Sequence, residues 1–329
     1  TLAVTRGTGA RERGATYAHD GEQVWYWTDA SGEDALHRKD AWGRGEAEQV
    51  RKPEDGPWKN GVVPSPDGDW LAWTDSNDDL VVMATDDGDT RVADHGENRG
   101  PFQLRWSPDG RWLAYVKTLA NDFHSVFVYD TDEREVHAVT GAWTEDHSPA
   151  WDPEGRYLYL VSGRANNPVL GHVDMQNVEV RNEKLYALML RPDVEHPLRD
   201  DAGLPPAGEG DGKDDDGKQD EGKKDDESDD DGDDDGDDDG KNGDEPDPVD
   251  IVFDGLAARV VELPVDHGDY GGLAATATHL FFVQNPLQGM AEGPGIFEEA
   301  APRAVLMRYS LEDREAKPFV PGIGGYELE

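Results

Sequence analysis

The chain has 329 residues, no cysteine, and 73 acidic against 31 basic side chains, giving a formal net charge of −42. Such a surface excludes nucleic acid and anionic membranes as natural partners, since binding to either depends on Lys and Arg. The missing cysteines exclude disulfides, thiolate nucleophiles and Cys-ligated zinc, and no apolar run is long enough to span a membrane.

A turn cluster recurs along the chain and predicts a repeated β unit. Its copies are His19-Asp20-Gly21, Pro66-Asp67-Gly68, Pro108-Asp109-Gly110 and Pro153-Glu154-Gly155. Their glycines are 47, 42 and 45 residues apart. In such a turn Pro presets φ, Asp bonds to its own backbone, and Gly takes a positive φ. The period fits a WD40-like, four-stranded propeller blade of about 40–45 residues.

The apolar alternation predicts an all-β protein built from four-stranded antiparallel blades. The first two blades are predicted at Ala15–Val50 and Trp58–Ala93. The third has strands at Phe102–Ser107, Trp112–Lys117, Ser125–Tyr129 and Glu135–Thr140. The fourth starts at Ser148 and adds Arg156–Ser162, Leu185–Arg191 and Arg259–Pro264. The fifth comprises Tyr270–Thr276, Thr278–Gln284, Ala304–Ser310 and Arg314–Val320. A lone blade cannot bury both faces, so we expect the blades to stack around an axis.

The two ends predict partial blades. Leu2–Thr5 is typical of the last strand of a preceding blade, and Gly322–Leu328 of the first strand of a following one. We therefore expect about five complete blades plus partial terminal blades, within a longer polypeptide. Tryptophans at equivalent strand positions are predicted to pack between blades: Trp25, Trp27, Trp70, Trp73, Trp106, Trp112 and Trp151.

An acidic insertion interrupts the fourth blade and divides the chain into regions 1–199, 200–248 and 249–329. Residues 201–250 hold 24 acids and five lysines, and the other 279 residues still carry −23. The run is too polar to offset its ordering entropy, so we predict disorder. The residues from Asp231 onward resemble the start of an EF-hand calcium loop. The match fails because position twelve, which should be a bidentate Glu, is Asn242. The acidic balance elsewhere suggests adaptation to high salt, which screens self-repulsion.

No motif for catalysis or cofactor binding occurs in the chain, so we expect no catalytic, cofactor or metal site in it. Ser65 and Ser107 adjoin the turn prolines and are predicted to support the turns rather than to act as nucleophiles. His124, His147 and His172 are interpreted as solvated polar residues. Three tryptophans in connecting segments are the candidates for a channel rim: Trp42, Trp58 and Trp143. Residues 285–302 form a second long insertion, inside the fifth blade. This insertion is either a cover over the propeller face or an ordinary flexible loop.

Residues 249–270 carry a resemblance to a known family. Asp254-Gly255-Leu256, Arg259-Val260, Leu263-Pro264-Val265, Gly268 and Tyr270 resemble a stretch in the second propeller of tricorn proteases. Further similar segments are Asn167-Pro168, Leu185–Leu188, Ala10–Arg13 and Ser31–Glu33. The propeller repeat alone is less specific, because TolB-type and prolyl-oligopeptidase-type propellers share it.

The resemblance implies a function outside the repeat itself. Tricorn-like proteins carry two propellers, a PDZ domain and a serine peptidase domain, and their second, seven-bladed propeller passes peptides to an internal chamber. It therefore implies a non-catalytic scaffold and portal within a cytoplasmic, homo-oligomeric peptidase, with peptides and the PDZ and peptidase domains as partners. Whether an enzyme is attached stays open from the residues alone. The alternative is a stand-alone, TolB-like propeller that binds a protein partner.

Overall fold

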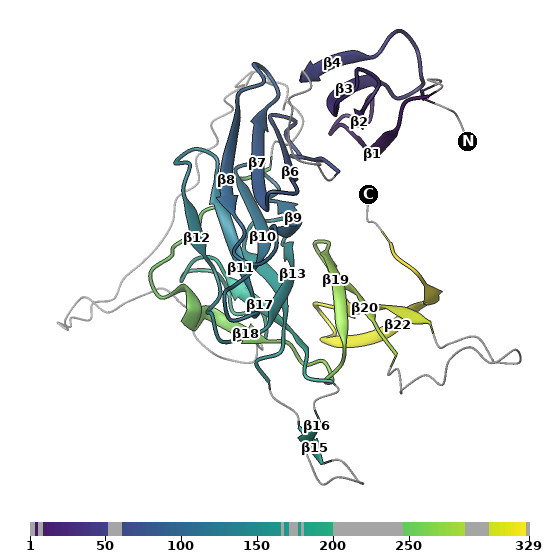
Figure 1. The fold of residues 1–329 in the computed structure, drawn as a ribbon. Helices are drawn as coiled ribbons and strands as arrows, with labels where there is room; N and C mark the ends of the chain where they lie inside the picture. The colour runs from purple at the N-terminus through teal and green to yellow at the C-terminus, as the bar shows by residue number, and fades with distance from the viewer. Residues whose placement is uncertain are drawn as a thin grey trace, which may run out of the picture. The chain divides into compact units, whose positions relative to one another are not determined.

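The computed structural model describes residues 4–5, 9–51, 61–165, 168–170, 177–178, 181–199, 246–286 and 303–326. The chain divides into two compact units, one formed by Thr1–Arg199 with Pro246–Glu329 and the other by Asp200–Glu245. The described residues all belong to the first unit, whose strands are shown in Figure 1.

Within the described residues, 20 strands form five four-stranded antiparallel sheets, named blades one to five. Blade one holds β1 (Glu12–Tyr17), β2 (Gln23–Thr28), β3 (Ala35–Asp40) and β4 (Glu48–Arg51). Blade two holds β5 (Val63–Pro64), β6 (Trp70–Thr74), β7 (Asp79–Ala84) and β8 (Thr90–His95). Blade three holds β9 (Phe102–Trp106), β10 (Trp112–Thr118), β11 (His124–Asp130) and β12 (Val136–Ala138). Blade four holds β13 (Asp146–Trp151), β14 (Tyr157–Ser162), β17 (Lys184–Met189) and β18 (Val260–Glu262). Blade five holds β19 (Tyr270–Ala275), β20 (His279–Gln284), β21 (Ala304–Ser310) and β22 (Glu315–Ile323).

The strands of each blade pair in chain order, and additional elements lie in the fourth blade. A short hairpin of β15 (Val169–Leu170) and β16 (Asn177–Val178) lies between β14 and β17. The 3₁₀ helix η1 (Leu256–Arg259) precedes β18. Residues 190–259 separate β17 from β18, yet the two strands pair antiparallel. The predicted all-β fold of four-stranded antiparallel blades is therefore confirmed.

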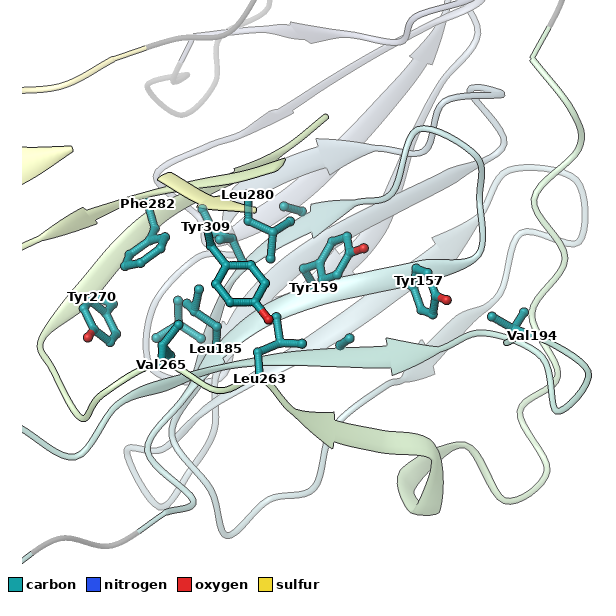
Figure 2. Close-up of a cluster of buried hydrophobic side chains, with 14 residues drawn as sticks. Tyr157, Tyr159, Leu185, Val194, Leu263, Val265, Tyr270, Leu280, Phe282 and Tyr309 are labelled. Atoms are coloured by element: carbon teal, nitrogen blue, oxygen red, sulfur yellow. The ribbon is translucent and has the colours of Figure 1, made fainter. Parts of the chain in front are cut away.

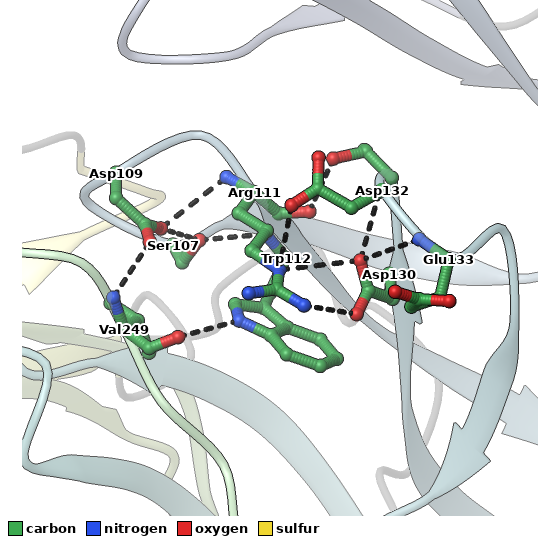
Figure 3. Close-up of polar contacts among 9 residues, drawn as sticks. Ser107, Asp109, Arg111, Trp112, Asp130, Asp132, Glu133 and Val249 are labelled. Atoms are coloured by element: carbon green, nitrogen blue, oxygen red, sulfur yellow. Dashed lines mark hydrogen bonds and ion pairs between the residues drawn. The ribbon is translucent and has the colours of Figure 1, made fainter.

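The recurrent turn forms the hairpin between the first two strands of a blade, as predicted. Figure 3 shows the third copy, in which the Ser107 hydroxyl donates to Asp109 over 2.5 Å and accepts from the Trp112 amide over 2.8 Å. Gly110 has φ +73, and a Cβ there would meet the Asp67 carboxylate of the preceding turn at 2.2 Å. The turns thus need glycine both for their own geometry and for close approach between blades. Ser107 supports the turn and has no free hydroxyl for chemistry.

Aromatic side chains fill the space between consecutive blades. Trp27 and Trp73 are fully buried and pack edge to face, with ring centroids 5.5 Å apart, in the cluster between blades one and two. Figure 2 shows the cluster between blades four and five, where Tyr159 and Tyr309 are almost fully buried. The predicted packing is confirmed for Trp25, Trp27, Trp73, Trp106, Trp112 and Trp151, which are buried, while Trp70 is half-buried against the cluster between blades two and three.

Two tryptophans also link the first strands of neighbouring blades. The Trp106 indole N–H of β9 donates to the carbonyl of Val63 in β5 over 3.0 Å. The Trp151 indole N–H of β13 donates to the carbonyl of Arg105 in β9 over 2.9 Å. A buried indole N–H usually finds an acceptor, and here the acceptor fixes the spacing of successive first strands.

The chain that returns after residue 245 is bound across blades three and four. The Val249 amide donates to Asp109 over 2.7 Å, and its carbonyl accepts from the Trp112 indole over 2.8 Å (Figure 3). Val249 is fully buried, and Phe253 stacks on His137 with centroids 4.1 Å apart. These contacts hold residues 249–253 against the hairpin-turn end of blade three.

The predicted extra strands at the two ends differ from the structure. Gly322 and Ile323 belong to β22, and residues 324–326 form no strand; residues 327–328 lie outside the described residues. β22 extends this far because two register shifts let its nine residues pair with the seven of β21. At the other end, Val4 and Thr5 are described and lie in no strand. Among the described residues no helix has the length and apolar character to cross a membrane.

Candidate functional site

The first strands of four blades carry a β-bulge with a residue in the left-handed region. These residues are Gly14 (φ +60), Gln103 (φ +53), Ser148 (φ +53) and Gly272 (φ +56), each beside a register shift. First strands line the central channel of a propeller. Bulges re-aim side chains, and a positive φ at Gln or Ser persists only where its surroundings hold it. The bulges are therefore the place to look for a site.

Three of these residues are joined from blade to blade. The Ser148 amide donates to Gln103 Oε1 over 2.7 Å, and Gln103 Nε2 donates to Ser148 Oγ over 3.4 Å. The Gly272 amide donates to the same Ser148 oxygen over 3.2 Å. Gln103, Ser148 and Gly272, here named the first-strand belt, thus connect β9, β13 and β19.

Ser148 also lies in a serine–histidine–carboxylate sequence of contacts. Its Oγ is 3.1 Å from His147 Nδ1, and His147 Nε2 is 3.0 Å from Glu183 Oε1. A nucleophile needs an exposed oxygen with a free lone pair. Ser148 is only 4% exposed, and its oxygen already accepts from Gly272 and Gln103. The three residues therefore hold strands together and do not provide an attacking hydroxyl.

The predicted solvated histidines are partly buried and paired. His124 Nδ1 contacts the Glu145 carboxylate, and His147 Nε2 lies 3.0 Å from a carboxylate oxygen of Glu183. Both lie inside strands, β11 and β13, rather than in loops. The interpretation as solvated loop residues was wrong for these two, since the carboxylates of Glu145, just before β13, and Glu183, just before β17, contact them. His172 lies outside the described residues.

One cavity, here named the Trp143 cavity, lies where the first strands of blades four and five begin. It has a volume of about 510 Å³ and is lined by Phe123, Trp143, Thr144, Glu145, Gly163, Arg164, Arg181, Asn182, Glu183, Gly268 and Asp269. Arg164 donates to the fully buried Asp146 carboxylate over 2.8 Å. The cavity therefore mixes paired acidic and basic groups with an exposed indole.

A second cavity, here named the Arg105 cavity, lies between the first strands of blades two, three and five. Its volume is also about 510 Å³, and its lining is Val63, Pro64, Pro66, Leu104, Arg105, Trp106, Gly272, Leu273, Ala274, Val283, Gly325 and Tyr326. The Tyr326 hydroxyl donates to the carbonyl of Phe281 over 2.8 Å, which fixes one wall. This lining contains one charged side chain, Arg105.

The three predicted rim tryptophans are not brought together. Trp143 is 82% exposed in the β12–β13 connection, where the first strand of blade four begins. Trp42 is 70% exposed in the β3–β4 loop, at the end of its blade where the first strand stops. Because antiparallel strands alternate in direction, these loops lie at opposite ends of their blades. Trp58 lies outside the described residues, and a rim role for any of them stays a prediction.

The Trp42 loop is held by a carboxylate with a depressed pKa. Hydrogen bonds from the Arg44 side chain, and from the Arg44 and Trp42 amides, lower the pKa of Asp40 from 3.8 to about 2. Because folding lowers the pKa of Asp40, its ionised form stabilises the folded state at pH values above the unfolded pKa of 3.8. This stabilisation is lost as the pH falls through the folded pKa of about 2. We expect an NMR titration of the Asp40 carboxyl carbon to have its midpoint near 2. Arg44→Gln should move the midpoint back toward the ordinary value, whereas an unchanged midpoint would exclude Arg44 as the cause.

The comparisons with known proteins decide the family. A sequence model described as "Tricorn protease second beta propeller domain" matches residues 1–329. The chain belongs to this family. Tricorn protease homolog 1 of Streptomyces coelicolor is 26% identical over 314 residues, covering 94% of this chain and 27% of that protein. The tricorn protease homolog of Saccharolobus solfataricus is 22% identical over 81% of this chain and 21% of that protein. The chain thus spans about a quarter of the length of these relatives.

Solved structures agree with this assignment at the level of the fold. The crystal structure of the tricorn protease aligns with a TM-score of 0.68 and 18% identity, over 94% of this chain and 26% of that one. A putative TolB from Agrobacterium tumefaciens aligns with a TM-score of 0.50 and 12% identity, over 96% of this chain and 84% of that one. At these identities the likeness shows the fold alone. The family match therefore favours the tricorn propeller over the TolB-like alternative.

Sequence reasoning missed the first-strand belt and Arg105. Strand alternation carried a signal for Arg105, because Leu104 and Trp106 are apolar neighbours that turn to the core. The left-handed conformations of Gln103 and Ser148 had no such signal, since neither residue type favours a positive φ. Among the described residues, no group of three or more His, Asp or Glu side chains is placed to hold a metal ion.

Proposed function

We propose that this chain is the non-catalytic propeller portion of a tricorn-like serine peptidase, and that it serves as scaffold and substrate portal. The observation that carries this proposal is the family match along the whole chain. The cavity between the first strands of three blades supports it, since that is where a channel through a propeller runs. Peptides would pass this channel to a catalytic domain outside the chain.

The proposal includes the partners and the location of the parent protein. The PDZ and peptidase domains would belong to the same polypeptide, which would act in the cytoplasm as a homo-oligomer. Along the chain, the acidic insertion lies between β17 and β18. Its main role in this proposal is solvation.

A thiol-labelling experiment tests the portal. Because this chain has no cysteine, Ala274→Cys in the full-length enzyme gives one reactive site in the propeller, on the wall of the Arg105 cavity. A bulky maleimide there should slow the cleavage of long peptides several-fold, while a small chromogenic substrate is cleaved at nearly its original rate. The physical reason is that the adduct narrows the route without touching the catalytic domain.

Two further variants complete the test. Asp132→Cys, on the exposed β11–β12 turn, is the matched control and should tolerate the same label without effect. Trp143→Cys tests whether that tryptophan lies on the rim. Equal rates for long peptides before and after labelling at Ala274 would overturn the portal proposal.

A further inference from the structure

Arg105 is held rigidly on the first strand of blade three with its side chain turned away from the core. Leu104 and Trp106, on either side, are 7% exposed and pack into the cluster between blades two and three. Arg105 lies between them and is exposed. The backbone carbonyl of Arg105 accepts a hydrogen bond from the Trp151 indole N–H, and the indole N–H of its neighbour Trp106 donates to the Val63 carbonyl. The base of the side chain is therefore fixed from both adjacent blades, which favours precise recognition.

The guanidinium of Arg105 has no carboxylate partner among the residues that the structure describes. It donates to the carbonyl of Leu104 over 2.9 Å, and no described residue forms an ion pair with it. This is unusual in a chain with 73 acidic and 31 basic side chains. Elsewhere, guanidinium groups near the first strands are neutralised, as Arg13 is by Asp34 and Arg164 by Asp146.

The walls around Arg105 are apolar or uncharged. Val63, Pro64 and Pro66 come from blade two, while Leu273, Ala274 and Val283 come from blade five. A site with apolar walls and one placed charge is typical of ligand recognition, because the walls exclude water and strengthen the single polar contact. A guanidinium presents parallel donors that match the two oxygens of a carboxylate.

We propose that the Arg105 cavity binds the carboxylate of a peptide, with apolar residues next to that carboxylate resting on the cavity walls. The inference rests on the proposed passage of peptides and specifies which peptides the channel retains. The acid could be the C-terminal carboxylate or the side chain of Asp or Glu. In a strongly negative protein, this cavity offers an anionic group a cation that no described carboxylate neutralises.

The experiment measures binding of acetylated alanine pentapeptides to the full chain by calorimetry, at a salt concentration that screens the overall charge. One probe has a free C-terminal carboxylate, a second has a C-terminal amide, and a third has the amide with glutamate at the central position. We expect the plain amide to bind about tenfold to a hundredfold more weakly than the free acid, since a charge-assisted hydrogen bond is lost. The third probe tells whether a side-chain carboxylate substitutes for the C-terminal one.

Two variants separate a local contact from a general charge effect. Arg105→Met keeps the length and apolar stem of the side chain and should abolish the preference for the acid. Arg181→Met makes the same charge change in the Trp143 cavity, where Arg181 is also exposed and forms no ion pair with a described residue. It should leave the preference intact. Equal affinity of the parent chain for acid and amide, or equal loss in both variants, would overturn the inference.

The outcomes also separate this inference from the proposed function. If the label at Ala274→Cys slows the cleavage of long peptides but the acid and the amide peptides bind equally, the channel passes peptides without discriminating by their charge. If Arg105→Met abolishes the preference for the acid but the label leaves the cleavage rate of long peptides unchanged, the cavity binds peptides but does not lie on their route to the catalytic domain.

Discussion

Replacing Trp73 with alanine should lower the free energy of unfolding by about 3–5 kcal/mol, the usual cost of deleting a large buried aromatic side chain. Trp73 lies on β6, is fully buried, and packs edge to face on Trp27 of blade one. Leu71 and Met83 of its own blade are fully buried in the same cluster. The substitution therefore removes apolar contacts from both sides of the interface between the two blades.

Two comparison variants make the Trp73 result specific. Trp143→Ala removes a tryptophan that is 82% exposed and should change stability by less than about 0.5 kcal/mol. Trp73→Phe should cost less than Trp73→Ala, because the buried indole N–H of Trp73 has no hydrogen-bond partner among the described residues and its loss carries little penalty. Denaturation by urea, followed by circular dichroism, measures all three. A loss below about 1 kcal/mol for Trp73→Ala would mean that blades one and two pack less tightly than the structure has them.

The blade organisation was readable from the sequence because local chemistry repeats. In the first four blades the hairpin turn between the first two strands places glycine where a positive φ is required, as at Gly68, Gly110 and Gly155. Apolar alternation then located the following strands to within one or two residues, for example at β10 and β14. These signals act within a few residues of each other, so one sequence suffices to find them.

The functional part of the fold depends on contacts between residues far apart in the chain. Gln103 and Ser148 adopt left-handed conformations because each is held by a residue about 45 positions away, and no local pattern marks them. Val249 reaches Asp109 across 140 residues, so its buried position after an acidic insertion was equally hidden. The end of β22 was misplaced for a related reason: register shifts, which the residues do not reveal, prolong its pairing.

Asp94→Ala should lower the free energy of unfolding by about 3 kcal/mol, the lower part of the range for breaking a buried ion pair. Asp94 of blade two accepts from Lys117 of blade three over 3.0 Å and from the Tyr115 hydroxyl over 2.7 Å. The side chains of Asp94 and Lys117 are 14% and 12% exposed. Burial raises the pKa of Tyr115, and Asp94 raises it further, so the hydroxyl stays protonated and donates.

A double substitution shows whether the cost comes from the charge left behind. In Asp94→Ala the Lys117 ammonium remains between the blades without its carboxylate, whereas Asp94→Ala with Lys117→Met removes both charges and keeps an apolar stem. We expect the double variant to recover about half or more of the loss, since an ion pair replaced by apolar groups is often close to neutral. The stability of Asp94→Asn should lie between that of the parent chain and that of Asp94→Ala, because the amide oxygen of the asparagine still accepts from Tyr115. If the single and double variants lose the same stability, the interface depends on the shape of Asp94 and its bond to Tyr115, and the ion pair with Lys117 adds nothing.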